Sequence, residues 1–189
     1  MNNNLPIIIG LSGATGAIYG VELLKILKLL NIKTILVASE MGFYTAKEEL
    51  NLKPKDIIAL ADEYYPNTDF NAPIASGSFL NRGMIVAPCS VKSLSAIANS
   101  YDSNLLVRSA DVCLKEKRKL VIMFRETPLH LGHIQLMEKI ALYGGIIAPP
   151  LPAFYNNPKT IDDIVKHSIL RVLDLFDIEH NLLQRWGSK

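Results

Sequence analysis

Two residues of opposite charge, Arg125 and Glu126, directly follow the apolar run at residues 120–124. A guanidinium at the end of a buried strand could bind a phosphate through two parallel hydrogen bonds. A carboxylate beside it could accept a proton if its pKa is raised. The two side chains could instead form an ion pair with each other or with Lys115. The pattern therefore indicates acid–base chemistry next to an anion, with a structural ion pair as the alternative.

Segments rich in small and hydroxyl-bearing residues follow three other apolar runs of the sequence. The candidate residues in these segments are Gly13, Ala14, Thr15, Ser39, Ser90, Val91, Lys92 and Ser93. Small residues let a ligand approach the backbone, and the N-terminus of a following helix attracts a phosphate. A tight turn at residues 10–17 and helix capping by the serines would explain the same residues without any ligand.

The spacing of the glycines argues against a dinucleotide site. The turn reads GxxGxxG, whereas dinucleotide-binding turns read GxGxxG. Such sites also place an acid at the tip of the second strand, where this sequence has Ser39, with Glu40 one residue later. These two features favour a mononucleotide such as FMN over a nicotinamide dinucleotide.

Aromatic and histidine residues supply further candidates. Phe154 and Tyr155 follow a proline-rich loop, where they could form the wall of a ligand site or close the edge of the core. Trp186, the only tryptophan, could pack on its own domain or on a partner subunit. His130 and His133 are three residues apart without a third ligand nearby, so we expect no metal site.

Strands and helices alternate along the predicted chain. Apolar runs predict strands at residues 5–11, 32–38, 83–87, 120–124 and 146–148. Helical spacing predicts helices at residues 17–30, 41–50, 54–61, 93–100, 105–117, 131–143 and 161–176, with mostly loop at 62–79. This order is typical of an α/β fold in which a parallel sheet carries helices on both faces. Ligands of such sheets bind beyond the carboxyl ends of the strands, where the residues described above lie.

Length and composition fit one globular domain spanning residues 1–189. Hydrophobic residues make up 49% and charged residues 20%, which excludes a disordered chain. The net charge of +2 is spread along the chain, so we expect no nucleic-acid partner. Cys89 and Cys113 are too few for a disulfide framework, and no segment is typical of a signal peptide or a membrane span. These features predict a cytoplasmic protein.

Seven segments of the chain together closely resemble the flavin prenyltransferase family, the UbiX/Pad type. Its members were formerly called polyprenyl-hydroxybenzoate or aromatic-acid decarboxylases. The segments are GLSGATGAIYG at 10–20, ASGSF at 75–79, PCSVKSLSAIA at 88–98, RSADVCLKEKRKLV at 108–121, RETPLHLGH at 125–133, PPLPAFY at 149–155 and RWG at 185–187. The resemblance extends over almost the whole chain, and the order and spacing of the segments make it specific.

The resemblance implies a flavodoxin-like or Rossmann-like three-layer subunit and a metal-independent reaction. The dimethylallyl group of dimethylallyl phosphate would be joined to N5 and C6 of reduced FMN. The product, prenylated FMN, would serve a decarboxylase of the UbiD type. The subunits would assemble into a homododecamer with active sites at subunit junctions. No sequence feature separates the ubiquinone branch of the family from the aromatic-acid branch.

The resemblance also assigns roles to individual residues. FMN would contact Gly13, Ala14, Thr15, Ser39, Ser90, Val91, Lys92, Ser93 and Arg125. The prenyl phosphate site would contain Arg108, Lys115, Glu126, Tyr155, Arg171 and Trp186. Catalysis would depend on Glu49, Lys115 and Glu126. Relatives often have serine at the position of Thr15, which keeps the hydroxyl group.

The required chemistry suggests what several of these residues would do. Tyr155 and Trp186 would stabilise an allylic cation through their ring faces. Lys115, Arg125 and Arg171 would offset the charge of the leaving phosphate. Glu126, or the released phosphate beside it, would accept the proton that leaves on ring closure.

Two other functions remain open at this point. One is a flavin-dependent decarboxylase that acts directly on a carboxylated substrate, such as a phosphopantothenoylcysteine decarboxylase. The other is a flavin carrier or assembly subunit without enzymatic activity.

Overall fold

A six-stranded parallel sheet organises the computed structural model, which describes residues 5–182. Its strands are β1 (Ile7–Leu11), β2 (Thr34–Ala38), β3 (Glu63–Pro66), β4 (Gly83–Cys89), β5 (Lys119–Phe124) and β6 (Ile146–Ile147). They lie in the order β3-β2-β1-β4-β5-β6, which is the order of the doubly wound nucleotide-binding folds.

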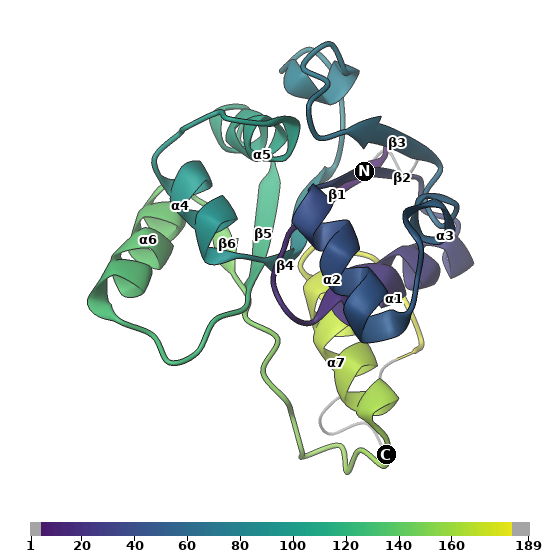
Figure 1. Cartoon of the computed structure of the whole chain (residues 1–189). Coiled ribbons are helices and arrows are strands. Elements are labelled where there is room, and N and C mark those ends of the chain that lie inside the picture. The colour runs from purple at the N-terminus through teal and green to yellow at the C-terminus, as the bar shows by residue number, and fades with distance from the viewer. Residues whose placement is uncertain (1–4, 183–189) are drawn as a thin grey trace.

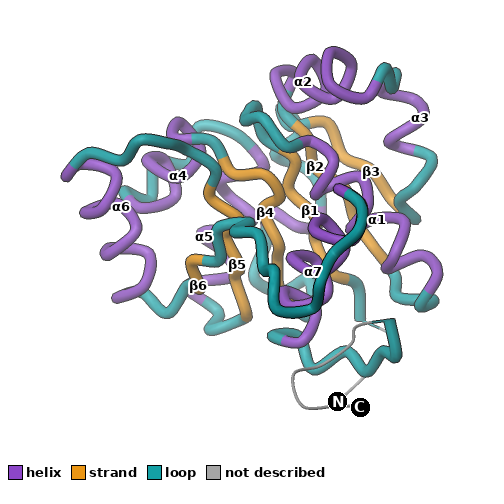
Figure 2. Tube along the Cα trace, turned by 90° about the horizontal axis from the view of Figure 1, so that it is seen from below, coloured by secondary structure: helices purple, strands orange, loops and turns teal. Residues whose placement is uncertain are grey.

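Helices cover both faces of this sheet (Figures 1 and 2). They are α1 (Ala17–Leu29), α2 (Glu40–Leu50), α3 (Pro54–Ile58), α4 (Val91–Ala98), α5 (Leu105–Lys115), α6 (Leu131–Leu142) and α7 (Ile161–Asp174), with a short 3₁₀ helix, η1, at Pro73–Ala75. The helices begin and end within a few residues of the predicted positions. The predicted three-layer α/β fold is confirmed.

Alternating side chains of the strands build two separate cores. In β1, Ile7 and Ile9 face the layer that contains α1 and α7, whereas Ile8 faces the layer of α4, α5 and α6. Successive side chains of a strand point to opposite faces, so a strand covered on both faces has to be apolar throughout. This explains why β1, β2 and β4 are fully buried and appear in the sequence as continuous apolar runs.

The sequence did not predict β3, which lies at one edge of the sheet. Its four residues, EYYP, are partly exposed and pair only with β2. A short edge strand with a charged residue and a proline lacks the apolar run that marks the central strands. We therefore expected a loop where the structure has a strand. The correction matters because the end of β3 contributes to the site described below.

The chain reverses its direction of winding between β1 and β4. From β1 it continues to β2 on one side, whereas β4 pairs with the other side of β1. The loops after these two strands therefore diverge and leave a crevice at the carboxyl edge of the sheet, the usual ligand position in such folds. None of the helices within residues 5–182 is both long and apolar enough to cross a membrane.

Candidate active site

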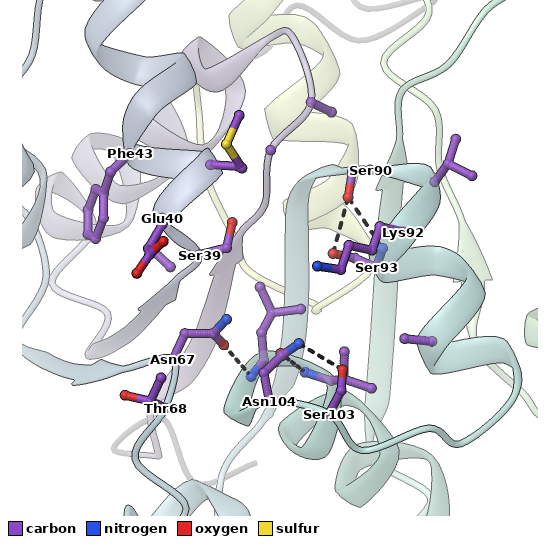
Figure 3. Close-up of a pocket in the computed structure, with 18 of the residues that line it drawn as sticks. Ser39, Glu40, Phe43, Asn67, Thr68, Ser90, Lys92, Ser93, Ser103 and Asn104 are labelled. Carbon is purple, nitrogen blue, oxygen red and sulfur yellow. Dashed lines mark hydrogen bonds between the residues drawn. The ribbon is translucent and has the colours of Figure 1, made fainter.

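A cleft of about 1110 Å³ lies at the carboxyl edge of the sheet (Figure 3). The residues that follow five successive strands of the sheet line it. They include Gly13, Ala14 and Thr15 after β1, Ser39 after β2, Asn67 after β3, Ser90, Val91, Lys92 and Ser93 after β4, and Arg125 and Glu126 after β5. The structure thus brings together all nine residues predicted to contact a flavin, together with one predicted catalytic carboxylate, Glu126.

Ser12 holds the loops after β1 and β4 together beneath the cleft. Its side chain is buried, and its Oγ donates to the Pro88 carbonyl at 2.9 Å while accepting from the Ser90 N–H at 2.8 Å. The Ser12 N–H also donates to the Pro88 carbonyl, at 3.3 Å. This network fixes the start of the α4 turn relative to the glycine-rich turn.

We expect Ser12→Ala to lower the free energy of unfolding by about 1–3 kcal/mol, since a buried N–H and a buried carbonyl lose a partner. Chemical denaturation of both proteins measures this difference. Ser95→Ala on helix α4 is the matched control, with an expected change of at most about 0.5 kcal/mol. Equal stability of Ser12→Ala and wild type would show that the network does not hold the two loops.

Ser39 and Ser90 both cap a helix and line the cleft, so capping is confirmed and leaves room for the predicted ligand contact, which stays a prediction. Ser39 Oγ accepts from the Gly42 N–H at 3.0 Å at the start of α2. Ser90 Oγ accepts from the Ser93 N–H at 3.3 Å and donates to Ser93 Oγ at 3.2 Å. Figure 3 shows Ser39 on one side of the cleft and the Ser90–Ser93 pair on the other. The N-termini of α2 and α4 therefore border the cleft and favour an anion there.

The N-terminus of α1, in contrast, holds a carboxylate of the protein itself. Glu49 of α2 accepts hydrogen bonds from the N–H groups of Gly16 and Ala17 at 2.9–3.0 Å. A negative charge at this position is stabilised by the helix dipole. Glu49 lies next to the glycine-rich turn but is not among the residues that line the cleft. Its predicted catalytic role stays a prediction.

Arg125 and Glu126 line the cleft without pairing with each other. Among residues 5–182, neither forms a salt bridge with the other or with Lys115, which pairs with Glu116 instead. Burial raises the pKa of the nearby Tyr19, and the positive charge of Arg125 opposes that rise. Glu126 accepts a hydrogen bond from the Thr127 N–H at 2.9 Å. Both charged groups can therefore turn to a ligand, as the phosphate-binding and proton-transfer hypothesis requires.

Aromatic and amide residues that the sequence analysis missed complete the cleft. Phe43 and Tyr64 line it with ring centroids 6.1 Å apart. Asn67, on the same side of the cleft as Phe43 (Figure 3), links the end of β3 to α5, because its side-chain oxygen accepts from the Leu106 N–H at 2.9 Å. Asn104 caps α5 by accepting from the Val107 N–H at 3.1 Å. Asn67 follows directly on β3, so a correct prediction of that strand would have identified it.

Two predicted substrate residues gather around residues 75–79, away from the cleft. Arg108 Nε donates to the Ala75 carbonyl at 3.0 Å and its Nη1 pairs with Asp102 at 2.9 Å. Lys115 lies at the end of α5 beside Gly77, so close that a β-carbon added to this glycine would come within 2.7 Å of Lys115 Nζ. Neither Arg108 nor Lys115 lines the cleft of the same subunit.

Tyr155 and Arg171 form a third group near the end of β6. Arg171 lines a hollow of about 280 Å³ with His167, and the Tyr155 hydroxyl lies 2.8 Å from His167 Nε2. This hollow shares no lining residue with the larger cleft. Trp186, the remaining predicted residue, lies outside the described residues.

His130, His133 and Cys89 have structural positions. His130 Nδ1 accepts from the Gly132 N–H at 3.0 Å, and the His130 ring stacks on that of His133 with centroids 3.7 Å apart at the start of α6. In the described part of the chain, no group of three or more potential metal ligands occurs. Burial strongly raises the pKa of the Cys89 thiol, so this cysteine is unsuited to act as a thiolate nucleophile.

Comparison with known proteins decides the family of this chain. Residues 1–169 match the family model described as Flavoprotein. The flavin prenyltransferase UbiX of Thauera aromatica is 51% identical over 182 residues, which cover 96% of this chain and 94% of that protein. The chain belongs to the UbiX-type flavin prenyltransferase family.

Solved structures of the family have the same fold. AnUbiX, crystallised in complex with FMN and dimethylallyl pyrophosphate, superposes with a TM-score of 0.96 at 42% identity, covering 98% of this chain and 99% of that one. A dodecameric FMN-dependent UbiX-like decarboxylase from Escherichia coli O157:H7 has a TM-score of 0.94 at 45% identity, with 97% and 100% covered. The family resemblance expected from the sequence is therefore confirmed over nearly the whole chain.

Proposed function

We propose that this protein is a flavin prenyltransferase that joins the dimethylallyl group of dimethylallyl phosphate to N5 and C6 of reduced FMN. The observation that carries this proposal is the 51% identity to a flavin prenyltransferase over almost the full length of both chains. The cleft is consistent with it, because three of the segments on which the family resemblance rests, 10–20, 88–98 and 125–133, contribute to its walls.

The cleft fits FMN in shape and in chemistry. Its volume of about 1110 Å³ is large enough for a mononucleotide, and Phe43 and Tyr64 offer apolar surface to a flat ring. The hydroxyl groups of Ser90 and Ser93 and the start of α4 suit a phosphate or a ribityl chain. Arg125 adds a cation to the wall of the cleft. Bound reduced FMN would supply N5 and C6 as the nucleophilic positions of the reaction.

The second substrate needs a cationic cradle, and we propose that neighbouring subunits complete it. Lys115 lies near Gly77 and Arg171 near β6, in two groups that do not reach the cleft of their own subunit. A homododecamer with active sites at subunit junctions would bring these cations beside the flavin, together with Arg108, Tyr155 and Trp186. Their positive charges would then offset the charge on the leaving phosphate.

Glu126 is our candidate for the proton acceptor. The side chain is exposed and lines the cleft, next in sequence to Arg125. The Thr127 N–H donates to one of its carboxylate oxygens. The other oxygen is then able to take a proton from the bound flavin. Glu49 would act near the glycine-rich turn, from its position at the N-terminus of α1.

The product would pass to a second enzyme in the cytoplasm. Prenylated FMN is a modified cofactor, so we propose a decarboxylase of the UbiD type as its recipient. Mixing the purified protein, FMN, a reductant and dimethylallyl phosphate with such an apo-decarboxylase should restore decarboxylation.

Mass spectrometry of the flavin tests the proposed function directly. The purified protein is incubated without oxygen with FMN, a reductant and dimethylallyl phosphate. A flavin heavier by one C5H8 unit is the expected product, with release of one phosphate. An unchanged flavin mass would contradict the proposal and favour a flavin carrier. Release of CO2 from a carboxylated substrate without prenyl phosphate would favour a decarboxylase.

Lys115→Ala should raise the KM for dimethylallyl phosphate by about tenfold or more, with a much smaller change for FMN, because it removes one cation from the phosphate site. Steady-state kinetics with each substrate varied in turn separates the two effects. Lys47→Ala on α2 is a matched control, since Lys47 is exposed and lies outside the cleft. Equal changes in both KM values would show that Lys115 is a structural residue.

A further inference from the structure

His167 directly contacts Tyr155, one of the residues predicted to bind the prenyl phosphate. It lies on α7 with 6% of its surface exposed, and its Nε2 is 2.8 Å from the hydroxyl oxygen of Tyr155. The two rings meet edge to face, with centroids 5.4 Å apart and planes at 81°. Distance and ring orientation therefore both fix the position of the phenol relative to the helix.

Arg171 stands on the same face of α7 as His167, one helical turn later. Residues four apart on a helix are neighbours, and both side chains line the hollow of about 280 Å³ next to β6. Apolar residues form much of its remaining wall, among them Ile147 and Val172. A hydroxyl group and a guanidinium beside an apolar hollow suit a small organic phosphate with a hydrocarbon tail.

A carboxylate of the same helix orients Arg171 in turn. Arg171 Nη1 pairs with Asp174 at 2.5 Å, and the other oxygen of Asp174 lies 3.2 Å from His180 Nε2. Helix α7 therefore holds the Arg171 guanidinium through Asp174 and the Tyr155 hydroxyl through His167. The two groups that would meet the phosphate are both positioned by residues of one rigid element.

Tyr155 needs such support because its own segment has no regular structure. Residues 148–160 connect β6 to α7 without helix or strand, and 52% of the Tyr155 surface is exposed. Local backbone bonds such as Asn157 N–H to the Phe154 carbonyl, at 3.0 Å, shape the turn. The contact with His167 ties this loop to α7.

The protonation state of His167 determines how the contact works. Burial lowers the pKa of His167, the charge of Arg171 lowers it further, and that of Asp174 opposes them. The imidazole is therefore neutral near pH 7 and carries a proton on one ring nitrogen. With that proton on Nε2, His167 donates to the Tyr155 oxygen, and the phenolic proton is directed to an acceptor such as a phosphate oxygen.

We propose that His167 is a positioning residue that aligns the Tyr155 hydroxyl with the phosphate of the prenyl phosphate substrate. This inference rests on the proposed function. His167 acts through Tyr155 rather than by touching the flavin, so its removal should affect the prenyl phosphate and leave FMN binding unchanged.

Four variants test the inference: His167→Leu, His167→Gln, Tyr155→Phe and the double variant His167→Leu/Tyr155→Phe. We expect His167→Leu to raise both the KM and the dissociation constant for dimethylallyl phosphate about tenfold, because the Tyr155 hydroxyl would lose its alignment with the phosphate. His167→Gln should recover much of this loss because its amide N–H can donate from a similar position. The double variant should bind dimethylallyl phosphate as tightly as Tyr155→Phe alone, since the two residues act as one unit.

Calorimetry with dimethylallyl phosphate and flavin fluorescence titration measure the two binding steps separately from turnover. Unchanged dimethylallyl phosphate affinity in His167→Leu, or additive losses in the double variant, would overturn the inference. Nitrogen-15 NMR of the imidazole should find the Nε2–H form of His167 in the wild type, and a ring protonated only on Nδ1 would also overturn it.

A control variant and the activity of the wild type distinguish failure of the His167 role from failure of the proposed function. Lys166→Ala changes the neighbouring exposed position, which pairs with Asp162 along the helix, and should leave both affinities unchanged. Absence of prenylated flavin with the wild type would refute the proposed function. A wild type that forms product while His167→Leu is equally active would refute only the role of His167.

Discussion

Glu126→Gln should lower the rate of prenylated flavin formation by about 10²-fold or more, because an amide cannot accept the proton that a carboxylate can. The substitution preserves the size of the side chain, and its oxygen can still accept from the Thr127 N–H, 2.9 Å away in the wild type. FMN should therefore bind with nearly unchanged affinity. Anaerobic single-turnover mass spectrometry measures the rate, and quenching of flavin fluorescence measures binding.

Glu138→Gln is the matched control for this experiment. Glu138 lies on α6, is exposed and does not line the cleft, so its loss of charge should leave turnover unchanged. Full turnover by Glu126→Gln would remove Glu126 from the proton-transfer step. The released phosphate would then be the preferred acceptor.

Gly20→Ala should destabilise the protein by about 1–3 kcal/mol, although alanine is the better helix former. A β-carbon at position 20 would lie 2.3 Å from the Ala87 carbonyl oxygen, which belongs to the backbone of β4 and cannot move aside cheaply. Helix α1 would have to shift away from the sheet. Thermal unfolding should show a midpoint lower by about 2–12 °C for a chain of this length.

Opposing physical effects make this substitution informative. Helix propensity alone would raise stability by about 1 kcal/mol, so the two effects predict opposite signs. Glu48→Ala, at an exposed position of α2, controls for the introduction of alanine and should change stability by at most about 0.5 kcal/mol. A midpoint for Gly20→Ala at or above that of the wild type would show that α1 and β4 can separate without cost.

The fold could be predicted because burial on both faces leaves a simple pattern. Ile7, Ile8 and Ile9 are all fully buried, although they alternate between two cores. Such a run is hard to accommodate outside a parallel sheet between two helix layers. β3 could not be predicted in the same way, because an edge strand with partly exposed tyrosines carries no equivalent constraint.

The candidate site was only partly predictable for a related reason. Residues that follow predicted strands, such as Ser39 and Arg125, could be assigned to one edge of the sheet by topology alone. Phe43 and Asn104 line the same cleft but lie within or before helices, where the sequence offers no marker of a ligand. Whether Arg125 and Glu126 pair with each other is decided by side-chain geometry, which spacing does not determine.

By itself, the sequence determined the family, the three-layer fold and the edge of the sheet at which a flavin would bind, because periodicity and motif order are local properties of the chain. Tertiary structure decided which side chains meet. It placed Glu49 on the N-terminus of α1, joined two loops through Ser12, and brought His167 to Tyr155. These contacts join residues that are 12 to 78 positions apart, and they depend on how the helices pack on the sheet rather than on any local pattern.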